Sequence, residues 1–442
     1  MCMSQFESSI LNDTGLQDLK QEFLEINQID AALYDKYEVK RGLRNKDGSG
    51  VLAGLTKISS VLGFHKVEGE LLPIDGLLKY RGTEIQDLVA QLLPQKRFYF
   101  ERICFFLFLG RLPSEDELSQ FLRVFQESRV IPDAILDHVI RPIPSKNVMN
   151  KLQTAVSALY AFDANPDSLD PFENFLSSVR LIAKLPFIVA YSYLSAFGGR
   201  DVRYLAPPSE LSQAEAFLYV LNQGKMPSQD EAEIVDLSLV LHAEHGGGNN
   251  STFTTYVVSS SGSDLYSTLA AAVASLKGPL HGAANKKVMD MMSDIKAHLS
   301  DLASLEALEA YLEKIVLKKG HDRSGKLYGL GHAVYTKSDP RAVIIRGYAE
   351  SIARKVGRED EFRLYEAIAT EGPKVFQRVK GSDKVISPNV DFYSGFVYDC
   401  LGIPMDIFTP LFAMARAAGW CSHRVEEIVF GKRIIRPGYK FI

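Results

Sequence analysis

The chain has 442 residues, of which 50 are Lys or Arg and 54 are Asp or Glu, so its formal net charge is -4. At about 150 residues per domain, this length predicts roughly two to three compact units. The composition, 46% apolar and 24% charged, excludes a collagenous or disordered chain, and the small negative charge argues against a nucleic-acid-binding protein, whose phosphate contacts need a basic excess.

The cysteines and the N-terminal residues indicate a cytoplasmic location. The four cysteines are far apart and have no CxxC spacing, which is typical of reduced cysteines in a cytosolic protein. The first residues, MCMSQFESSILND, have neither a basic region nor an apolar run, so we expect no export or organelle signal. The longest uncharged apolar run, 185–199, contains Pro186 and is shorter than the ~20 residues of a membrane span. We expect a soluble protein with no membrane partner.

Strand patterns are confined to residues 52–80, where alternating segments around 67–70 and 74–76 predict small hairpins. Helical patterns dominate the rest of the chain. Three of them open with capping-box pairs, namely Ser114 with Glu117, Ser212 with Glu215, and Ser228 with Glu231. The last of these helices should run to His242. No repeat period is visible, which disfavours a solenoid.

Further helices are predicted in the C-terminal half from their start and stop residues. Their expected ranges are 264–277, 283–298, 302–319, a helix opened by Asp339-Pro340 and ended by Gly357, and one from Pro410 through Arg416 to Glu427. The stretch from about 286 to 384 is more charged and less aromatic than its flanks. We therefore predict a mainly α protein with a smaller inserted domain in this stretch.

Four of the nine histidines lie in glycine-rich surroundings. They are His242 and His245 in LHAEHGGGNNST, His281 in GPLHGAAN, and His332 in YGLGHAVY. Glycine beside a histidine allows backbone or a ligand to approach closely, which a packed core position does not need. One such histidine is as often a structural residue at a helix end as a functional one. Four of them indicate a functional site.

Three kinds of chemistry are open for this site. A metal site would use the three-residue spacing of His242 and His245, but the sequence has no HExxH or CxxC pattern, and the following glycines end the helix. A phosphate-binding loop would use GGGNNS or GPLHGAANKK, but neither matches GxxxxGK[ST]. The third is acid–base chemistry on a substrate rich in carboxylates.

His281 and Asp391 support the acid–base alternative. His281 precedes the helical pattern 283–298, so the positive end of the helix dipole favours a neutral ring that can donate to an enolate oxygen. Asp391, in SPNVDFYSG, stands at another expected helix start, and a carboxylate is suited to take a proton from carbon. Taken alone, Asp391 would more often be a carboxylate that only complements a helix dipole.

Arginines would bind the substrate carboxylates. Arg341 falls in the first turn of the helix opened by Asp339-Pro340, where backbone N–H groups and the guanidinium bind one anion together. Arg416 lies in the apolar stretch FAMARAAGW, where a buried guanidinium needs an anionic partner. Arg436, in RIIRPGYKF, is less distinctive, because exposed arginines are usually solvated charges.

Five motifs, in this order, resemble those of the citrate synthase family. They are LHAEHGGGNNST, GPLHGAAN, GLGHAVYTKSDPRA, SPNVDFYSGFVYDCLGIP and FAMARAAGW. The resemblance runs from about His242 to the C-terminus, and the earlier YRGTEIQDL is compatible with it. It implies a mainly α homodimer with few short hairpin strands. A small helical domain of residues 283–387 would close over a large helical domain of residues 1–282 and 388–442.

The resemblance also implies an acyltransferase that condenses acetyl-CoA with oxaloacetate and hydrolyses the thioester to citrate and CoA, with acetyl-CoA as co-substrate, no permanently bound cofactor and no metal. His281 would hold the enol of acetyl-CoA, Asp391 would remove the methyl proton, and His332 would donate to the oxaloacetate carbonyl. The residues expected to bind carboxylates are His245, Arg341, Arg416 and Arg436, the last reaching the site of the partner subunit. The residues expected to bind CoA are Leu330, Gly331, Ala333, Val334, Lys337 and Lys384.

One departure from the family concerns CoA binding. Thr336 stands where many members have a basic residue that touches a CoA phosphate, which leaves Lys337 and Lys384 as candidates for that contact. The nearest alternative activity is that of a 2-methylcitrate synthase, which uses propionyl-CoA and needs an acyl pocket larger by one methylene. A non-catalytic sensor of CoA or dicarboxylates is disfavoured, because all three catalytic residue types are present.

Overall fold

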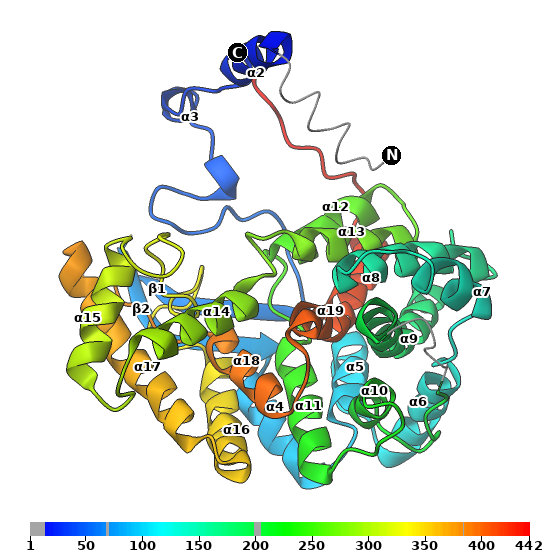
Figure 1. Ribbon diagram of the computed structural model, residues 1–442. Helices are drawn as coiled ribbons and strands as arrows, with labels where there is room; N and C mark the ends of the chain where they lie inside the picture. Colours follow the sequence, from blue (N-terminus) through cyan, green and yellow to red (C-terminus); the bar gives the residue numbers. More distant parts are fainter. Residues whose placement is uncertain (1–13, 68–69, 199–204, 383) are drawn as a thin grey trace. The chain divides into compact units, whose positions relative to one another are not determined.

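The computed structural model describes residues 14–67, 70–198, 205–382 and 384–442, and it confirms a mainly α chain with one small sheet (Figure 1). The chain divides into two compact units, Met1–Ala53 and Gly54–Ile442. The first contains α2 (Thr14–Ile26), α3 (Ala32–Lys36) and η1 (Arg41–Leu43). All further elements belong to the second unit. The expected small domain of residues 283–387 stays a prediction.

The second unit begins with a β-hairpin and continues with helices. Its elements up to α10 are β1 (Ser59–Val67), β2 (Glu70–Tyr80), β3 (Thr83–Glu84), α4 (Ile85–Leu92), η2 (Leu93–Gln95), α5 (Tyr99–Leu109), α6 (Glu115–Glu127), α7 (Asp133–Ile135), η3 (Leu136–Ile140), α8 (Val148–Ala158), η4 (Leu159–Phe162), α9 (Pro171–Phe197) and α10 (Gln213–Leu221). The remaining elements are α11 (Gln229–His242), α12 (Asn250–Ser260), α13 (Leu265–Lys277), α14 (Ala284–His298), α15 (Leu305–Val316), α16 (Pro340–Val356), α17 (Glu359–Lys380), α18 (Val390–Cys400), η5 (Met405–Ile407) and α19 (Phe408–Phe430).

Local capping chemistry sets many of the helix boundaries. All three predicted capping boxes are present, with reciprocal side-chain and backbone hydrogen bonds at the starts of α6, α10 and α11. Helix α16 starts after its N-cap Asp339 and ends at Gly357, whose φ of 71° suits a glycine. Helix α15 is shorter than the expected 302–319, because the side chain of Ser304 caps it by accepting from Ala307 N.

The strands form a three-stranded antiparallel sheet in the order β1-β2-β3. Segments 67–70 and 74–76 belong to one long hairpin rather than to separate small ones, and residues 68 and 69 lie outside the described residues. An added Cβ at Gly63 would overlap the Val334 carbonyl, and one at Gly76 would overlap the Ser338 carbonyl. The hairpin therefore lies directly against the loop that precedes α16.

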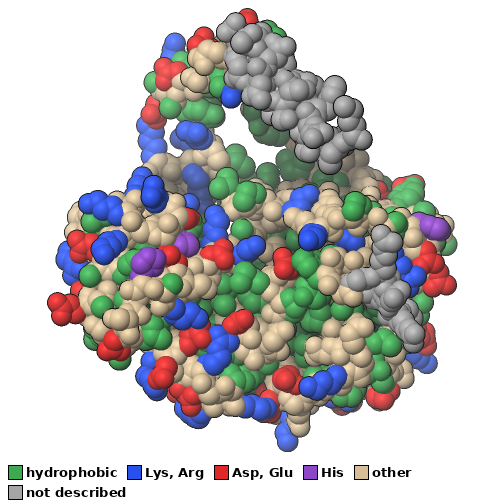
Figure 2. Space-filling view, in the orientation of Figure 1, with side chains coloured by type: hydrophobic (Ala, Val, Ile, Leu, Met, Phe, Trp, Pro, Cys, Tyr) green, Lys and Arg blue, Asp and Glu red, His purple; other side chains and the backbone are tan. Residues whose placement is uncertain are grey.

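Helix α19 is the central helix of the second unit and packs against α5, α9, α11, α12 and α13 (Figure 1). It is buried on nearly every side, as expected for a core helix. The apolar run 185–199 lies largely in α9, which by length and composition alone would suffice to cross a membrane. Because 72% of its apolar window is buried inside the protein, α9 has the surroundings of a core helix. Side chains of both charge signs are interspersed over the face shown in Figure 2.

Candidate active site

His281 lies two residues before the N-cap of α14. Its Nε2 is 3.0 Å from Ser251 Oγ in the first turn of α12. Burial lowers the pKa of His281 to about 4, and the positive charge of Arg416 acts in the same direction. The ring is therefore neutral at pH 7, as the sequence led us to expect, although burial rather than the helix dipole is the main cause.

His332 lies in the loop between α15 and α16, and backbone hydrogen bonds fix its orientation. Its Nδ1 accepts from Val334 N (3.0 Å) and Tyr335 N (3.2 Å). When Nδ1 accepts, a neutral imidazole carries its hydrogen on Nε2. The ring is also stacked on Tyr335, with centroids 4.7 Å apart and planes at 26°. The loop thus holds His332 as a donor through Nε2.

His245 follows the C-terminal end of α11 and faces His332. The two rings meet edge to face with centroids 5.1 Å apart. His245 Nε2 is 3.1 Å from the hydroxyl of Tyr335, which is buried and had no signal in the sequence that marked it as a site residue. Burial holds the pKa of His245 well below its usual value, and the charge of Arg341 lowers it further. His245 is therefore neutral.

Arg341 lies in the first turn of α16 and is buried, as its expected role in anion binding requires. It forms a two-pronged ion pair with Asp339, with Nη2 to Oδ2 at 2.8 Å and Nε to Oδ1 at 3.1 Å. Asp339 Oδ2 also accepts from Val390 N (3.2 Å) at the start of α18. The sequence marked Asp339 only as a helix cap. In the structure it also joins the first turns of α16 and α18.

Arg416 lies in the middle of α19 and is 1% exposed. Its Nε donates to His242 O (2.6 Å), and its guanidinium lies over the Phe412 ring at 4.5 Å. Within the described residues, its buried Nη2 has no hydrogen-bond partner. Burial lowers the pKa of Arg416 to about 10, so it remains a cation at pH 7. A buried cation with an unused donor is suited to bind an anion.

Asp391 occupies the first turn of α18, as expected, after the N-cap Asn389. Asn389 Nδ2 donates to Gly331 O (2.8 Å), which ties the start of α18 to the loop of His332. Burial raises the pKa of Asp391 to about 6, although the charges of Arg341 and Arg416 oppose the increase. The carboxylate is thus a stronger base than an exposed aspartate and is still ionised at pH 7.

A pocket of about 550 Å³ adjoins these residues. His281 and His332 both line it, together with four of the six residues expected to bind CoA, which are Leu330, Gly331, Ala333 and Lys384. Lys287 and Lys326 also line it and were not predicted. Lys287 belongs to the GPLHGAANKK segment, so its place beside a conspicuous histidine was a usable signal.

Seven of the predicted site residues do not line this pocket, namely Asp391, His245, Arg341 and Arg416, described above, and Val334, Lys337 and Arg436. Val334 packs its carbonyl against Gly63 of β1, and Lys337 is an exposed residue of the same loop. Thr336, which replaces a basic residue of the family, donates its hydroxyl to Gly63 O at 3.1 Å. Arg436 is exposed in the segment that follows α19. A search of the described residues found no group of three or more His, Cys, Asp or Glu side chains that could hold a metal ion.

The site combines groups that suit one kind of chemistry. Two neutral histidines, His332 with its Nδ1 bound to backbone N–H groups, and a carboxylate of raised pKa are linked through their loops and charges to two buried guanidiniums. The guanidiniums can bind a dianionic acid, the carboxylate can take a proton from carbon, and a neutral imidazole can donate to the oxygen that becomes charged. The pocket lined by three lysines can receive a larger anionic molecule beside them.

Comparisons with known proteins show which family this chain resembles over most of its length. The family described as "Citrate synthase, C-terminal domain" matches residues 47–438. The chain is 37% identical to a citrate synthase of Deinococcus radiodurans over 83% of this chain and 90% of that protein, and 37% identical to one of Synechocystis sp. over 90% of both.

Two solved structures are similar over nearly the whole chain. The citrate synthase of Pyrobaculum aerophilum has a TM-score of 0.72 and 32% identity, covering 89% of this chain and 91% of that one. The citrate synthase of Thermoplasma acidophilum, solved as a ternary complex with carboxymethyl coenzyme A and oxaloacetate, has a TM-score of 0.75 and 27% identity, covering 91% and 96%.

Proposed function

This chain belongs to the citrate synthase family of acyl-CoA-condensing enzymes, and we propose that it condenses acetyl-CoA with oxaloacetate and hydrolyses the thioester to citrate and CoA. The observation that carries the proposal is the grouping of His281, His332 and Asp391 around the buried cations Arg341 and Arg416. A protein that only binds these molecules has no need of a carboxylate whose pKa is raised to about 6.

Proton removal is assigned to Asp391 and His281. The carboxylate of Asp391 takes a proton from the methyl group of acetyl-CoA, and the electron pair moves onto the thioester oxygen. That step is unfavourable in water, because the methyl group is a very weak acid. The neutral ring of His281 donates an N–H to the developing oxyanion and so lowers its energy as it forms.

Carbon–carbon bond formation is assigned to His332 and the arginines. The enolate carbon attacks the carbonyl carbon of oxaloacetate, the C=O π electrons move onto the carbonyl oxygen, and the Nε2–H of His332 donates to that oxygen as it gains charge. His332 suits this role because its Nδ1 is already occupied by two backbone N–H groups. Arg341, Arg416 and His245 bind the oxaloacetate carboxylates, and the buried cations supply the charge that a dianion requires.

The CoA portion of the substrate is assigned to the pocket that His281 and His332 line. Lys287, Lys326 and Lys384 supply positive charge for its phosphates, in place of the basic residue that Thr336 replaces. This assignment drops Lys337 as a phosphate ligand in favour of the two lysines that were not predicted.

Three further expectations complete the proposal. The protein is a cytoplasmic homodimer, in which Arg436 of each subunit reaches the site of the other. Residues 283–387 form the small domain, whose closure excludes water from the thioester until the carbon bond has formed. The chain needs no permanently bound cofactor.

The direct test follows free thiol while the purified protein is mixed with oxaloacetate and acetyl-CoA. Thiol release that depends on both substrates supports the proposal, and its absence overturns it. The second candidate, a 2-methylcitrate synthase, is tested by comparing kcat/KM for acetyl-CoA and propionyl-CoA. One methylene in an apolar pocket is worth ~1–3 kcal/mol, so a preference of about tenfold or more for propionyl-CoA would reassign the activity.

A further inference from the structure

Helix α19 makes one hydrogen bond or ion-pair contact with each of three consecutive residues at the C-terminal end of α11. Three groups on one face of α19, spaced three and four residues apart, contact the last residue of α11 and the two residues that follow it. The contacts are Arg416 Nε to His242 O (2.6 Å), Gly419 N to Ala243 O (3.1 Å) and His423 Nε2 to Glu244 Oε1 (2.9 Å). The next residue in the loop is His245, so this row of contacts ends beside a residue assigned to substrate binding.

The side chain of Glu244 reaches past His245 and binds the backbone N–H of the residue that follows it. Glu244 therefore constrains the backbone on both sides of His245. Besides its contact with His423, Oε1 accepts from Gly246 N (2.6 Å) and from Ser59 Oγ of β1 (2.7 Å). Gly246 has a φ of 83°, which lets the chain turn back toward the carboxylate. Glu244 is fully buried, and an added Cβ at Gly419 would overlap its Oε2. The position of His245 therefore depends on this one carboxylate.

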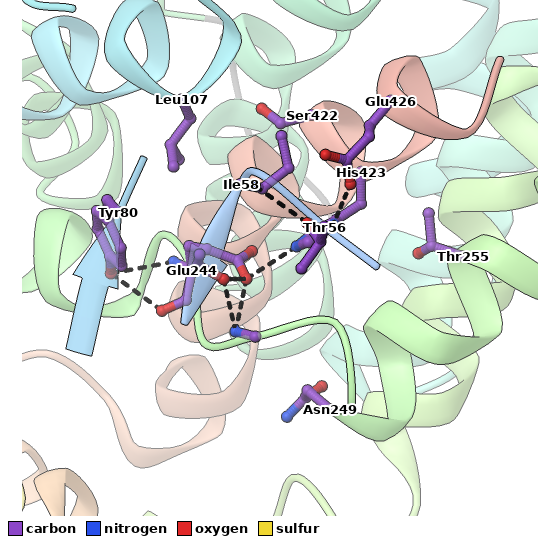
Figure 3. Close-up of polar contacts among 12 residues, drawn as sticks. Thr56, Ile58, Tyr80, Leu107, Glu244, Asn249, Thr255, Ser422, His423 and Glu426 are labelled. Carbon is purple, nitrogen blue, oxygen red and sulfur yellow. Dashed lines mark hydrogen bonds and ion pairs between the residues drawn. The ribbon is translucent and has the colours of Figure 1, made fainter. Parts of the chain in front are cut away.

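His423 is the buried cation that compensates the charge of Glu244 (Figure 3). Its Nδ1 is 2.6 Å from the Tyr256 hydroxyl, which also contacts Glu426 Oε2 at 2.8 Å. Glu426 Oε1 in turn accepts from Lys57 N (2.7 Å). Burial lowers the pKa of His423, but the charges of Glu244 and Glu426 and its bonds to them outweigh burial and raise the value to about 9. His423 is thus charged at pH 7.

We propose that the buried Glu244–His423 ion pair is a positioning device that fixes His245 and Arg416 for binding the oxo-dicarboxylate substrate. This inference rests on the proposed function. A buried ion pair is usually no more stabilising than apolar residues of the same shape, so its benefit lies in the geometry it imposes. The negative charge of Glu244 also opposes the fall in the pKa of Arg416 that burial causes, and so helps to keep that guanidinium charged.

The pair should make substrate affinity sensitive to alkaline pH. The polar and charged groups around the pair are Ser59 from β1, Tyr80 from β2, Tyr256 from α12, Arg416 and Glu426 from α19, and Thr56. Arg81 acts on Glu426 and Tyr256 at the edge of this group. Above a pH of about 9, His423 loses its proton and leaves two buried carboxylates without their cation. The KM for oxaloacetate should then rise before kcat falls.

The test compares single and double variants of the full-length enzyme by steady-state kinetics. His423→Gln keeps a hydrogen-bond donor but removes the charge, and Glu244→Gln removes the opposite charge. The control is Arg424→Gln, which removes a buried charge from the neighbouring position of α19, where Arg424 contacts Asn174 and Thr268 instead of the loop. Emission from Trp420, the one tryptophan of the chain, reports whether α19 remains packed.

We expect the KM for oxaloacetate to rise on the order of tenfold or more in His423→Gln, the effect of removing a group that orients a ligand-binding residue, with a smaller change in kcat. The double variant Glu244→Gln/His423→Gln should be less impaired than His423→Gln, because it leaves one buried carboxylate, that of Glu426, without its cation instead of two. The rise in KM near pH 9 should disappear in His423→Gln, which leaves only the rise expected near pH 10, where Arg416 loses its charge. Arg424→Gln should keep the KM of the unaltered enzyme.

A KM in His423→Gln within twofold of that of Arg424→Gln would overturn the inference, as would a double variant in which the two losses simply add. If His423→Gln does not fold, Ser59→Ala decides, because it removes a hydrogen bond to Glu244 without changing charge. A severalfold rise in its KM supports positioning, and no change refutes it. Failure of the proposed function is distinguishable, because the unaltered enzyme would then release no thiol.

Discussion

The surroundings of Asp391 make its carboxylate more basic than that of an exposed aspartate. It lies in the first turn of α18, where helix dipoles stabilise negative charge, yet burial raises its pKa to about 6. The base must be ionised to take a proton, so activity should fall as pH decreases through about 6. His281 does not contribute to this fall, because it gains its proton only near pH 4.

The measurement is kcat/KM between pH 5 and 8, which reports ionisations of the free enzyme, with Asp391→Asn as the comparison. We expect an acid limb centred near pH 6 in the unaltered enzyme. The variant should lose about 10²–10⁴-fold in kcat, keep its KM for oxaloacetate, and show no acid limb in its residual rate. A variant with unchanged turnover would contradict the assignment of the base.

Arg416 offers a separate prediction about substrate binding. Its buried Nη2 has no partner in the described part of the chain, so we expect it to donate to a substrate carboxylate. A hydrogen bond to a charged group contributes ~1.5–3 kcal/mol. Arg416→Gln should therefore raise the KM for oxaloacetate roughly tenfold to a hundredfold, as measured by initial rates. Arg416→Lys keeps the charge but not the contact with His242 O. Its KM for oxaloacetate should therefore lie between those of the unaltered enzyme and Arg416→Gln.

The sequence could mark residues that carry distinctive chemistry in their own motif, such as His281 and Asp391, and the structure places both at helix starts as predicted. It was insufficient for residues whose role comes from a distant segment. In the sequence, Tyr335 cannot be distinguished from an ordinary core residue. Its place in the site becomes evident only in the fold, where His245 contacts its hydroxyl. Lys326 is one lysine among many exposed ones, and only the pocket distinguishes it.

At the scale of elements, capping residues made helix starts predictable, because each cap satisfies backbone donors locally. The predicted starts of α6, α10, α11 and α16 are confirmed. The hairpin was harder to predict, because its pairing joins residues such as Ser59 and Tyr80 that are distant in sequence. Gly63 and Gly76, which lie inside the strands, allow close approach of another loop.

Gly63 therefore gives a prediction about an element that supports the site. A Cβ there would overlap the carbonyl of Val334, whose N–H orients His332. Gly63→Ala should lower the free energy of unfolding by about 1–3 kcal/mol, as overpacking does, and should also lower kcat. Gly347, exposed inside α16, has open space around its would-be Cβ. Gly347→Ala should stabilise by about 0.5–1 kcal/mol with unchanged kinetics.

Chemical denaturation and initial rates on the same preparations measure both effects. If Gly63→Ala lowers stability but leaves kcat unchanged, the hairpin does not orient His332.

At the scale of the whole molecule, a net charge of -4 is compatible with two anionic substrates because the relevant charge is local. Two buried arginines and three pocket lysines are concentrated at the site, while charges of both signs are interspersed over the face shown in Figure 2. Composition excluded whole classes of protein, but it could not indicate this distribution, which depends on the fold.

The proposed homodimer makes a prediction that depends on the complete assembly. Arg436 is exposed, and its neighbour Ile435 is held to α12 by a bond from Ile435 N to Ser260 Oγ (3.0 Å). If Arg436 completes the site of the other subunit, Asp391→Asn and Arg436→Ala should each be nearly inactive alone. A mixed dimer, however, has one site with both the native Asp391 and the native Arg436. Such complementation is possible only when two chains share each site.

The two variants are unfolded together, refolded as an equal mixture, and assayed for thiol release. Half of the dimers should be mixed, and each should have one competent site out of two, so activity should recover to about a quarter of the unaltered enzyme's value. Refolding each variant separately and then mixing is the control, and it should recover nothing while subunits do not exchange. No recovery after joint refolding, with normal dimers by size, would mean that Arg436 acts within its own subunit or outside the site.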